Sequence, residues 1–371
     1  MTTWKTGELG KFITLKRGYD LPQQKRKNGG VPIFSSSGIS GTHDTAMVKA
    51  PGVITGRYGT IGQVFMADED FWPLNTTLYV EDFHGNNPRF IYYFLKTLGW
   101  EKFTSASAVP GINRNTVHKE TICLPDIATQ DKIASILTTL DDKIEINEKI
   151  NDNLEQQAQT LFQKLFVENV NFKWRKGTIS DLGTVVGGST PSKSKPEYYT
   201  EHGIAWITPK DLSVNKSKFI AHGENDITEL GLKNSSASIM PEGTVLFSSR
   251  APIGYIAIAA GEVTTNQGFK SVVPKAEIGT PFVYYFLKNA LPTIEGMASG
   301  STFKEVSGST MKDVPALIPD SETLAKFNEF CGPLFGQQQV LERQNQSLAA
   351  LRDSLLPKLM SGEIDVSDVS I

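Results

Sequence analysis

The sequence predicts an α+β chain built by internal duplication, with two similar globular domains separated by two long helices. Three observations predict this fold class. The segment FIYYFLK, which begins at Phe90, returns almost unchanged as FVYYFLK at Phe282. Other short segments recur in the same order around both of these aromatic segments. Each copy then ends in a stretch with the heptad pattern of a coiled-coil helix. A period of about 190 residues is the size of a domain rather than of a solenoid repeat.

The recurring segments begin upstream of the aromatic ones. GVITGRYGTIGQV, from Gly52, resembles GTVLFSSRAPIGYI, from Gly243, because each joins an apolar run to an arginine and then to Ile-Gly. Downstream, TICLPDI in the first copy resembles DVPALIPDS in the second. Clusters of Gly, Pro, Asn and Ser separate short β-rich runs, which predicts strands joined by turns. The aromatic segments are expected to form short helices that pack into the core of each domain.

These boundaries divide the chain into four parts. We predict a first globular domain over residues 1–126 and a first long helix over 127–169. A second globular domain follows over 170–320, and a second long helix with a C-terminal tail covers 321–371.

The first long helix is predicted from a stretch, Asp131–Phe166, that contains neither Gly nor Pro. Its apolar residues alternate at spacings of four and three, which is typical of a coiled-coil seam. The seam residues expected in this helix are Ile133, Leu137, Leu140, Ile144, Asn151, Leu154, Leu161 and Leu165.

The same register, carried into the second copy, predicts a matching seam there. Gly332-Pro333 is expected to separate an early turn from the main helix, since proline suits a first helical position. Pro357 is expected to kink its end. The seam residues expected in this helix are Leu334, Leu341, Asn345, Leu348, Leu355 and Leu359.

Asn151 and Asn345 occupy equivalent positions of the two predicted seams. A polar residue in a seam costs stability but fixes register and partner. The alternative is that the middle of each helix is exposed to solvent. The two helices could pair with each other, or each could pair with its counterpart in a homodimer, and the heptads allow both.

Composition narrows the class of protein. A hydrophobic fraction of 39% supports globular cores, and no apolar run approaches the ~20 residues of a membrane span. The first residues lack an apolar signal core, and two cysteines form neither a disulfide framework nor a metal set. We therefore expect a cytoplasmic protein without a membrane partner. The net charge of −3 argues weakly against nucleic acid, although a local basic patch would still permit it.

Catalytic motifs are hard to find in the sequence. GRYGTIG lacks the lysine of a phosphate-binding loop, and the five histidines have no metal-ligand spacing. There is no Asn/Asp-Pro-Pro-aromatic segment of the kind that amino-methyltransferases use. A nuclease-like set could combine Asp126 with Asp141 and Lys143, but the last two lie on the long helix, where charges usually face solvent. The sequence therefore indicates a binding protein that catalyses nothing and holds neither metal nor cofactor itself.

The candidate binding residues lie on Gly-rich, Ser-rich and Lys-rich segments. Lysine and arginine neutralise phosphates, small hydroxyls permit close approach, and arginine or asparagine can read base edges. In the first domain the candidates for DNA contact are Lys16, Arg17, Tyr19, Lys25, Arg26, Lys27, His43, Arg57, Tyr58, Asn113 and Arg114. In the second they are Ser189, Thr190, Lys193, Lys195, Lys210, Arg250, Thr302 and Lys304.

Arg57 and Arg250 are the favoured pair among these candidates. Both copies of the repeat have an arginine just before Ile-Gly, beside a glycine-rich turn. The structural alternative for both arginines is an ion pair within the domain.

In each copy a globular unit is followed by a short Leu-Pro or Ile-Pro segment and then by a long helix. This order, present twice in the chain, resembles the specificity subunits of type I restriction-modification systems. The helix entry reads Gln130-Asp-Lys-Ile-Ala-Ser-Ile-Leu, which is close to the family pattern, and the ending LLPKLMSGEIDV is also similar to that family. The resemblance covers essentially the whole chain. The second entry departs from the pattern because Ser321-Glu-Thr replaces the Gln-led start, which leaves the beginning of that helix open.

The resemblance implies a specific role. Each globular domain would be a target recognition domain that reads one half of a bipartite, asymmetric site in double-stranded DNA. The two helices would form an antiparallel coiled coil. Two methylation subunits would dock mainly on the helices and carry S-adenosylmethionine. Restriction subunits would join with ATP and Mg²⁺. This chain would be a non-catalytic subunit.

Two other classes of function stay open at this point. A duplicated coiled-coil scaffold that holds protein partners without reading DNA would suit the acidic composition. A nuclease or methyltransferase in its own right would need an active site that the sequence does not reveal.

Overall fold

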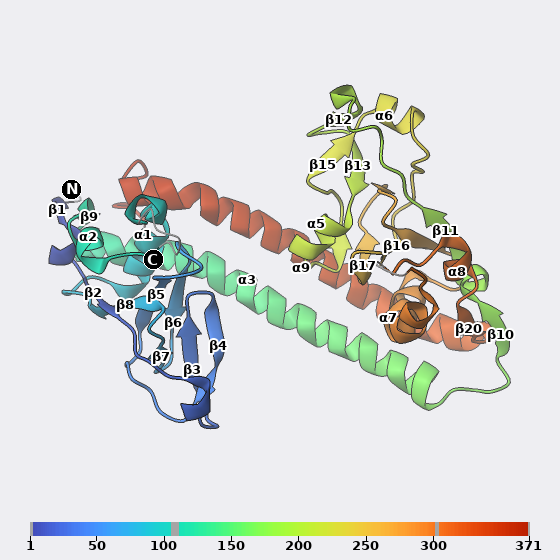
Figure 1. Ribbon diagram of the computed structural model, residues 1–371, viewed down its shortest axis with the longest axis horizontal. Coiled ribbons are helices and arrows are strands. Elements are labelled where there is room, and N and C mark those ends of the chain that lie inside the picture. Colours follow the sequence, from blue (N-terminus) through green and yellow to red (C-terminus); the bar gives the residue numbers. More distant parts are fainter. Residues whose placement is uncertain (1–2, 105–110, 301–303, 370–371) are drawn as a thin grey trace. The chain divides into compact units, whose positions relative to one another are not determined.

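The computed structural model describes residues 3–104, 111–300 and 304–369 (Figure 1). Contacts divide the chain into two compact units. Unit 1 combines Met1–Glu145 with Gln346–Ile371, and unit 2 is the continuous segment Ile146–Asn345. Each unit therefore contains one globular domain and parts of both long helices.

Unit 1 contains a two-stranded ribbon, a four-stranded sheet and a three-stranded sheet. The ribbon pairs β1 (Trp4–Glu8) with β9 (Thr121–Pro125). The four-stranded sheet has the order β2 (Thr14–Arg17), β8 (Thr77–Asp82), β5 (Gly52–Gly56), β6 (Val64–Ala67). The three-stranded sheet has the order β4 (Gly38–His43), β3 (Val31–Ser35), β7 (Trp72–Pro73). The short helices are η1 (Leu9–Lys11), η2 (Gln23–Lys25), α1 (Pro88–Lys96), η3 (Trp100–Phe103) and α2 (Arg114–His118).

Unit 2 repeats this plan with one more strand in each of its two sheets. Its ribbon pairs β10 (Arg175–Thr178) with β20 (Pro315–Ile318). One sheet has the order β11 (Gly183–Gly187), β19 (Lys270–Pro274), β16 (Val245–Ser249), β17 (Ile253–Ala259), β14 (Phe219–Ile220). The other has the order β12 (Tyr199–Thr200), β15 (Asn225–Ile227), β13 (Ile204–Ile207), β18 (Thr264–Thr265). The short helices are α4 (Ile179–Leu182), η5 (Pro196–Tyr198), α5 (Pro209–Val214), α6 (Glu229–Lys233), α7 (Thr280–Met297) and α8 (Gly308–Lys312).

The duplication is visible in strand register. In unit 1, Val53 pairs with Met66, and in unit 2, Val245 pairs with Ile258. The next two residue pairs along each hairpin also match, at the same sequence offset that separates the two aromatic segments. Both copies of the sequence therefore fold into the same hairpin.

The aromatic segments form core helices, as their composition predicts. In α1 the side chain of Asn87 accepts the N–H of Phe90, and Pro88 occupies the first turn, so the helix start is well capped. Five residues of FIYYFLK are buried in the main core of unit 1. The second copy begins a longer helix, α7, in which Phe282 and Tyr285 are buried.

The tyrosines of these segments also bond to the first long helix. The hydroxyl of Tyr93 donates to Asp141 at 2.6 Å within unit 1. The hydroxyl of Tyr285 donates to Glu155 at 2.9 Å within unit 2. The repeated aromatic segment thus joins each globular domain to α3.

The long helices are α3 (Ile127–Phe162), which ends in the π-helical turn η4 (Gln163–Glu168), and α9 (Ser321–Ser361). Asp126 and Asp320 cap them in the same way, since each carboxylate accepts a backbone N–H three residues further on. Asp126 is therefore a helix cap and no part of a nuclease-like set.

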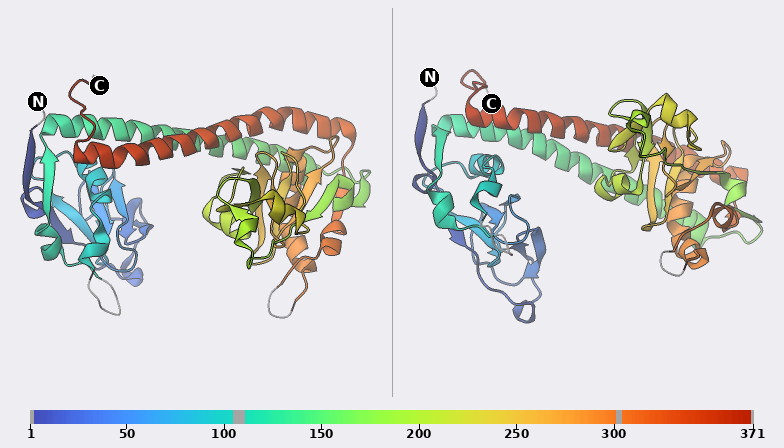
Figure 2. Two further views of the ribbon diagram at one scale, coloured as in Figure 1. Left: turned by 90° about the horizontal axis from the view of Figure 1, so that it is seen from above. Right: turned by 45° about the horizontal axis from the view of Figure 1, so that its top comes forward.

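Within each unit the two long helices run antiparallel. In unit 1, Arg352 of α9 donates to Asp141 of α3 at 2.6 Å, and Figure 2 shows these helix segments side by side. In unit 2, Asn147 bonds to Asn345. The predicted fold class is therefore confirmed: the chain is α+β and duplicated, and its two helices pair with each other.

One expectation about the helices was wrong, the break at Gly332-Pro333. Helix α9 is continuous through Gly332-Pro333, because Phe327, Cys331 and Phe335 on the same face are buried in the core of unit 2 and hold the helix together. Of the two asparagines that occupy equivalent seam positions, Asn345 accepts a hydrogen bond from Asn147, and the backbone carbonyl of Asn151 accepts one from Gln338.

All of the predicted seam positions are buried or half-buried. Fully buried are Ile133, Leu137, Leu341 and Leu359. Half-buried are Leu140, Ile144, Asn151, Leu154, Leu161, Leu165, Leu334, Asn345, Leu348 and Leu355.

A buried charge cluster fastens the globular part of unit 2 to both long helices. The ammonium of Lys218 lies 2.8 Å from a carboxylate oxygen of Glu155 and 2.9 Å from the side-chain amide oxygen of Gln338. Glu342 accepts the backbone N–H groups of Lys218 and Phe219. Burial lowers the pKa of Lys218 to about 8 against the opposing pull of Glu155. Burial alone would raise the pKa of Glu155, but the lysine charges outweigh burial and hold that pKa at about 2.

Candidate nucleic-acid interface

A cavity of about 670 Å³ in unit 1 brings together six of the predicted DNA-contact residues. Four chain segments form it: the end of β2, the turn after β5, Leu78 of β8, and the start of α2 with the residues just before it. Among its described lining residues there are four cations and no carboxylate. The six are Lys16, Arg17, Arg57, Tyr58, Asn113 and Arg114.

Arg57 is held at this cavity by its backbone and by its side chain. Its N–H donates to the carbonyl of Thr76 at 2.8 Å, and its Nε donates to the carbonyl of Ile112 at 3.4 Å. The guanidinium carbon lies 4.4 Å from the centre of the Tyr58 ring, a cation–π distance. The neighbouring residue, Gly111, must lack a side chain, because a Cβ there would lie 2.2 Å from the Tyr58 ring.

The other three cations make only exposed or long contacts. Lys16 and Arg17 pair with acidic residues of the surface, Glu81 and Asp20 respectively. Arg114 reaches the carbonyl of Leu15 at 3.5 Å. Exposed ion pairs contribute little to stability, so a DNA phosphate could replace these partners at small cost.

Asn113 has a structural task as well. Its side chain accepts the N–H of Asn115 and begins the five-residue helix α2. The cap fixes the backbone from which Arg114 and Asn115 project, and Asn115 also lines the cavity. The sequence interpretation missed Asn115, although it lies in the same NRN run as its two neighbours.

The other candidates in unit 1 are not among the residues that line this cavity. Tyr19 is half-buried and its hydroxyl shares a hydrogen bond with Tyr79. Lys25 and Lys27 are exposed around η2, whereas Arg26 is half-buried and donates to the carbonyl of Ser40. These three basic residues form a separate basic segment.

His43 is better explained as a structural residue, which corrects its assignment to the DNA surface. Its side chain is only 7% exposed and lies against Trp72. Its Nδ1 accepts the backbone N–H of Lys27 at 3.1 Å. A histidine in a loop of small and polar residues suggested exposure, but the packing of Trp72 over it closes it off.

The expected equivalence of Arg57 and Arg250 in the two copies is also wrong. The N–H of Arg57 donates to the carbonyl of Thr76, and the carbonyl of Arg57 accepts from the N–H of Ile112. In unit 2, the N–H of Ser249 donates to the carbonyl of Gly268, and the carbonyl of Ser249 accepts from the N–H of Val306. Ser249 is therefore the counterpart of Arg57, and Arg250 stands in the place of Tyr58. The arginines look equivalent in sequence because each precedes Ile-Gly, but the turn has the same length in both copies and Arg250 lies one residue closer to Ile-Gly than Arg57 does.

Arg250 makes the ion pair that was its structural alternative. Its guanidinium lies 3.4 Å from a carboxylate oxygen of Glu305, and both side chains are about 40% exposed. Burial lowers the pKa of the neighbouring Lys270, with Glu305 opposing that shift. Neither Glu305 nor Lys270 was expected, because no pattern in the sequence joins them to Arg250.

The remaining candidates of unit 2 are spread over several loops. Lys193, Lys195 and Lys304 are exposed, and Lys195 lies near Glu197. Lys210 pairs with Glu224 at 2.6 Å. Ser189 and Thr190 are half-buried, and Thr190 bonds to Gln267. Thr302 lies outside the described residues.

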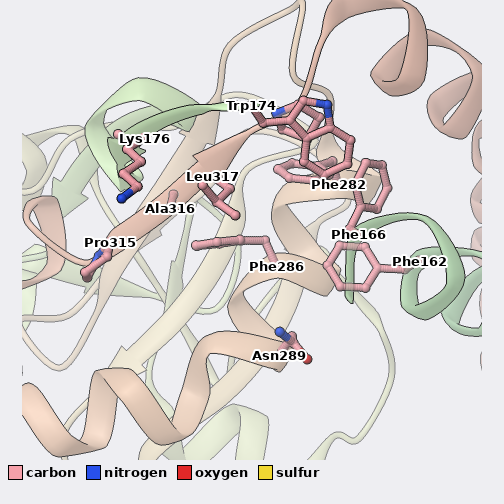
Figure 3. A pocket seen from close by; sticks show the side chains of 12 residues that line it. Phe162, Phe166, Trp174, Lys176, Phe282, Phe286, Asn289, Pro315, Ala316 and Leu317 are labelled. Carbon is pink, nitrogen blue, oxygen red and sulfur yellow. The ribbon is translucent and has the colours of Figure 1, made fainter. Parts of the chain in front are cut away.

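Unit 2 has a second kind of cavity, of about 360 Å³ (Figure 3). Phe162 and Phe166, from the end of α3 and the turn after it, line it together with Phe282 and Phe286 of α7. Trp174 and the ribbon strand β20 complete it. Its lining is mainly aromatic and aliphatic, so it does not suit a phosphate.

Metal sites and membrane-spanning helices are absent from the described ranges. No cluster of three or more His, Cys, Asp or Glu residues there could hold a metal ion. None of the described helices is long and apolar enough to cross a membrane.

The fold and the cation-lined cavity together describe a class of protein: a duplicated binding protein with two globular domains on an antiparallel helix pair. The family model for the type I restriction modification DNA specificity domain matches residues 1–156 and 171–351. The chain therefore belongs to this family. Membership confirms the predicted family.

Individual relatives agree with this assignment. The type I restriction enzyme MjaIX specificity subunit of Methanocaldococcus jannaschii is 38% identical over 194 residues, which are 50% of this chain and 45% of that protein. The HindI specificity subunit of Haemophilus influenzae is 25% identical over 358 residues, covering 75% of this chain and 77% of that one. This chain thus spans less than half of the first relative and about three quarters of the second.

One solved structure has the same fold. The crystal structure of the S subunit of a type I restriction-modification system from M. genitalium matches with a TM-score of 0.64 and covers 96% of both chains. The sequence identity is 19%, so this likeness supports the fold alone.

Proposed function

We propose that this chain is the DNA-reading subunit of a type I restriction-modification complex. Each globular domain would contact one half of a bipartite, asymmetric site in double-stranded DNA. The observation that carries the proposal is the cavity of unit 1, where three segments far apart in sequence bring four cations together without a carboxylate in the lining. Such a surface suits the phosphates and base edges of a duplex.

The partners follow from the family. Two methylation subunits would dock mainly on α3 and α9, and restriction subunits would join that assembly. S-adenosylmethionine, ATP and Mg²⁺ would be held by those partners rather than by this chain. The work would take place in the cytoplasm.

The test is selection from random duplex DNA with this chain co-purified with its methylation subunit. Two short enriched blocks at a fixed spacing are expected, because two diverged domains should read two different half-sites. A well-assembled complex that enriches no sequence would overturn the proposal and favour a protein scaffold that reads no DNA.

A substitution at the cavity separates these two functions. Arg57→Ala combined with Arg114→Ala should weaken DNA binding at least tenfold while the methylation subunit still co-purifies. Equal DNA affinity of the double variant and the unaltered chain would show that DNA binds elsewhere.

A further inference from the structure

The matching surfaces of the two units carry different charges. Strand register identifies the counterparts: Leu15 pairs with Val80 in unit 1, and Val185 pairs with Val272 in unit 2. Val186 and Gly187 therefore stand where unit 1 has Lys16 and Arg17.

The other two cations of the unit 1 cavity are replaced as well. Ser249 takes the place of Arg57 and is buried, with its hydroxyl bonded to the carbonyl of Gly268. The caps Asn113 and Ser307 begin α2 and α8, so Gly308 takes the place of Arg114. All four cations of the cavity thus have uncharged counterparts in unit 2.

Unit 2 has its own charges at this surface, of both signs. Arg250 stands in the place of Tyr58, and Lys270 stands in the place of Leu78. Glu305 is the counterpart of Gly111, because the following residues, Val306 and Ile112, make the same backbone bond. A carboxylate therefore occupies a position that must be bare in unit 1.

We infer that the two domains divide the work of DNA binding, with unit 1 as the phosphate anchor and Glu305 as a specificity-determining residue of unit 2. The inference rests on the proposed function. In unit 1, the four cations donate hydrogen bonds to backbone phosphates, which gives affinity without regard to sequence. The acidic partners of Lys16 and Arg17 do not line the cavity of unit 1, whereas Glu305 stands at the counterpart of the lining residue Gly111 and lies 3.4 Å from Arg250, so a phosphate that approaches Arg250 also meets a carboxylate.

The salt dependence of non-specific binding tests this division. The logarithm of the affinity falls with the logarithm of salt concentration with a slope of about 0.9 for each phosphate neutralised. The probe is a duplex of unrelated sequence, titrated with the full chain and its methylation subunit from low to moderate KCl concentration. Fluorescence anisotropy reports the affinity at each concentration.

Four substitutions give the expected pattern. Arg57→Ala and Arg114→Ala should each reduce the slope by about 1, whereas Arg250→Ala should leave it unchanged. Glu305→Gln should increase the slope by about 1, because it frees Arg250 for a phosphate. Equal slopes for Arg57→Ala and Arg250→Ala, or no effect of Glu305→Gln, would overturn the inference.

Two controls keep the result specific. Lys233→Ala removes an exposed lysine of α6 and should not alter the slope by as much as the cavity variants. Arg57→Lys keeps the charge and should keep the slope, even if the bond from Nε to Ile112 is lost. A slope that falls equally for Arg57→Lys and Arg57→Ala would mean that Arg57 acts by shaping the turn, against the inference.

The outcomes also separate this inference from the proposed function. If the unaltered complex binds no duplex and selects no sequence, both fail. If it selects a bipartite site but the variants at the two units have equal slopes, only the division of work fails.

Discussion

Asn147 of α3 donates a hydrogen bond from Nδ2 to Oδ1 of Asn345 in α9, at a distance of 2.8 Å. The same amide donates to Gln344 at 2.9 Å, and Asn147 is completely buried. Amides that meet between two helices favour the one alignment of the helices in which both partners can bond.

This pair gives a first prediction. Asn147→Leu should lower the free energy of unfolding of unit 2 by about 1–3 kcal/mol, because it leaves the polar groups of Asn345 and Gln344 without this partner. Asn147→Leu combined with Asn345→Leu should recover much of that loss, since both amides of the pair are then gone. Urea unfolding of the two single variants and the double variant measures the coupling. Additive losses would show that the two side chains act independently.

The charge cluster around Glu155 predicts an acid-sensitive attachment of the globular part of unit 2. The folded-state pKa of Glu155 is about 2, below its ordinary value of 4.5, so the unfolded chain binds more protons between these values. The stability from this group is complete above pH 4.5 and is lost as the pH falls through 2. Its size is about 3 kcal/mol for a shift of this order.

Thermal unfolding at pH 6 and at pH 3 tests this prediction. Glu155→Gln should lower Tm strongly at pH 6, because it leaves Lys218 buried without its carboxylate, and less at pH 3. The matched control is Glu229→Gln, which removes an exposed pair with Lys233 and should change Tm little at either pH. A Tm loss for Glu155→Gln that does not depend on pH would argue against the ion pair.

The uncharged side chain of Gln130 is expected to contribute strongly to the stability of unit 1. It is only 2% exposed, and its amide accepts the N–H of Asn87 while donating to Asn86 and to the carbonyl of Pro125. Gln130→Leu should cost about 2–3 kcal/mol in unit 1, because three polar groups, one buried and two half-buried, lose a partner. Gln157→Leu, at an exposed position of the same helix, should change stability by less than about 0.5 kcal/mol. Denaturant unfolding of both variants gives the comparison.

Gly18 in unit 1 and Gly188 in unit 2 both lie too close to a backbone carbonyl to carry a side chain without displacement of the backbone. A Cβ at Gly18 would lie 2.2 Å from the carbonyl oxygen of Leu74, and a Cβ at Gly188 would lie 2.0 Å from that of Asn266. Gly18→Ala should therefore lower the stability of unit 1 by about 2–4 kcal/mol through displacement of the backbone. Gly30→Ala is the control, since no atom lies within 4 Å of its Cβ position. Similar Tm values for the two variants would contradict the close approach.

The architecture could be predicted because repeats and heptads are patterns of the chain itself. The matched segments indicated the duplication, and the apolar spacing of Ile133, Leu137 and Leu341 indicated buried helix faces. The details that failed depend on neighbours that are distant in sequence. Gly332-Pro333 interrupts a helix by local preference, but the core contacts of Phe327 and Phe335 override that preference.

The candidate site likewise combines features that the sequence predicts with features that depend on contacts between residues distant in sequence. Basic residues could be assigned to loops, but which of them converge depends on tertiary structure. Lys16, Arg57 and Arg114 meet only because β2, the turn after β5 and α2 come together, whereas His43 is closed off by Trp72. The equivalence of Arg57 with Ser249 could not be found by matching arginines, because it is defined by backbone hydrogen bonds.

The composition of unit 1 has a consequence for how the protein folds as it is synthesised. Its core includes Leu355, Leu359, Met360 and Val366, together with residues from the first third of the chain. The ribosome makes the whole of unit 2 before it reaches those residues. The part of the protein that is translated first is therefore the part whose core is completed last, and its exposed apolar surface must wait for the final helix turns to cover it.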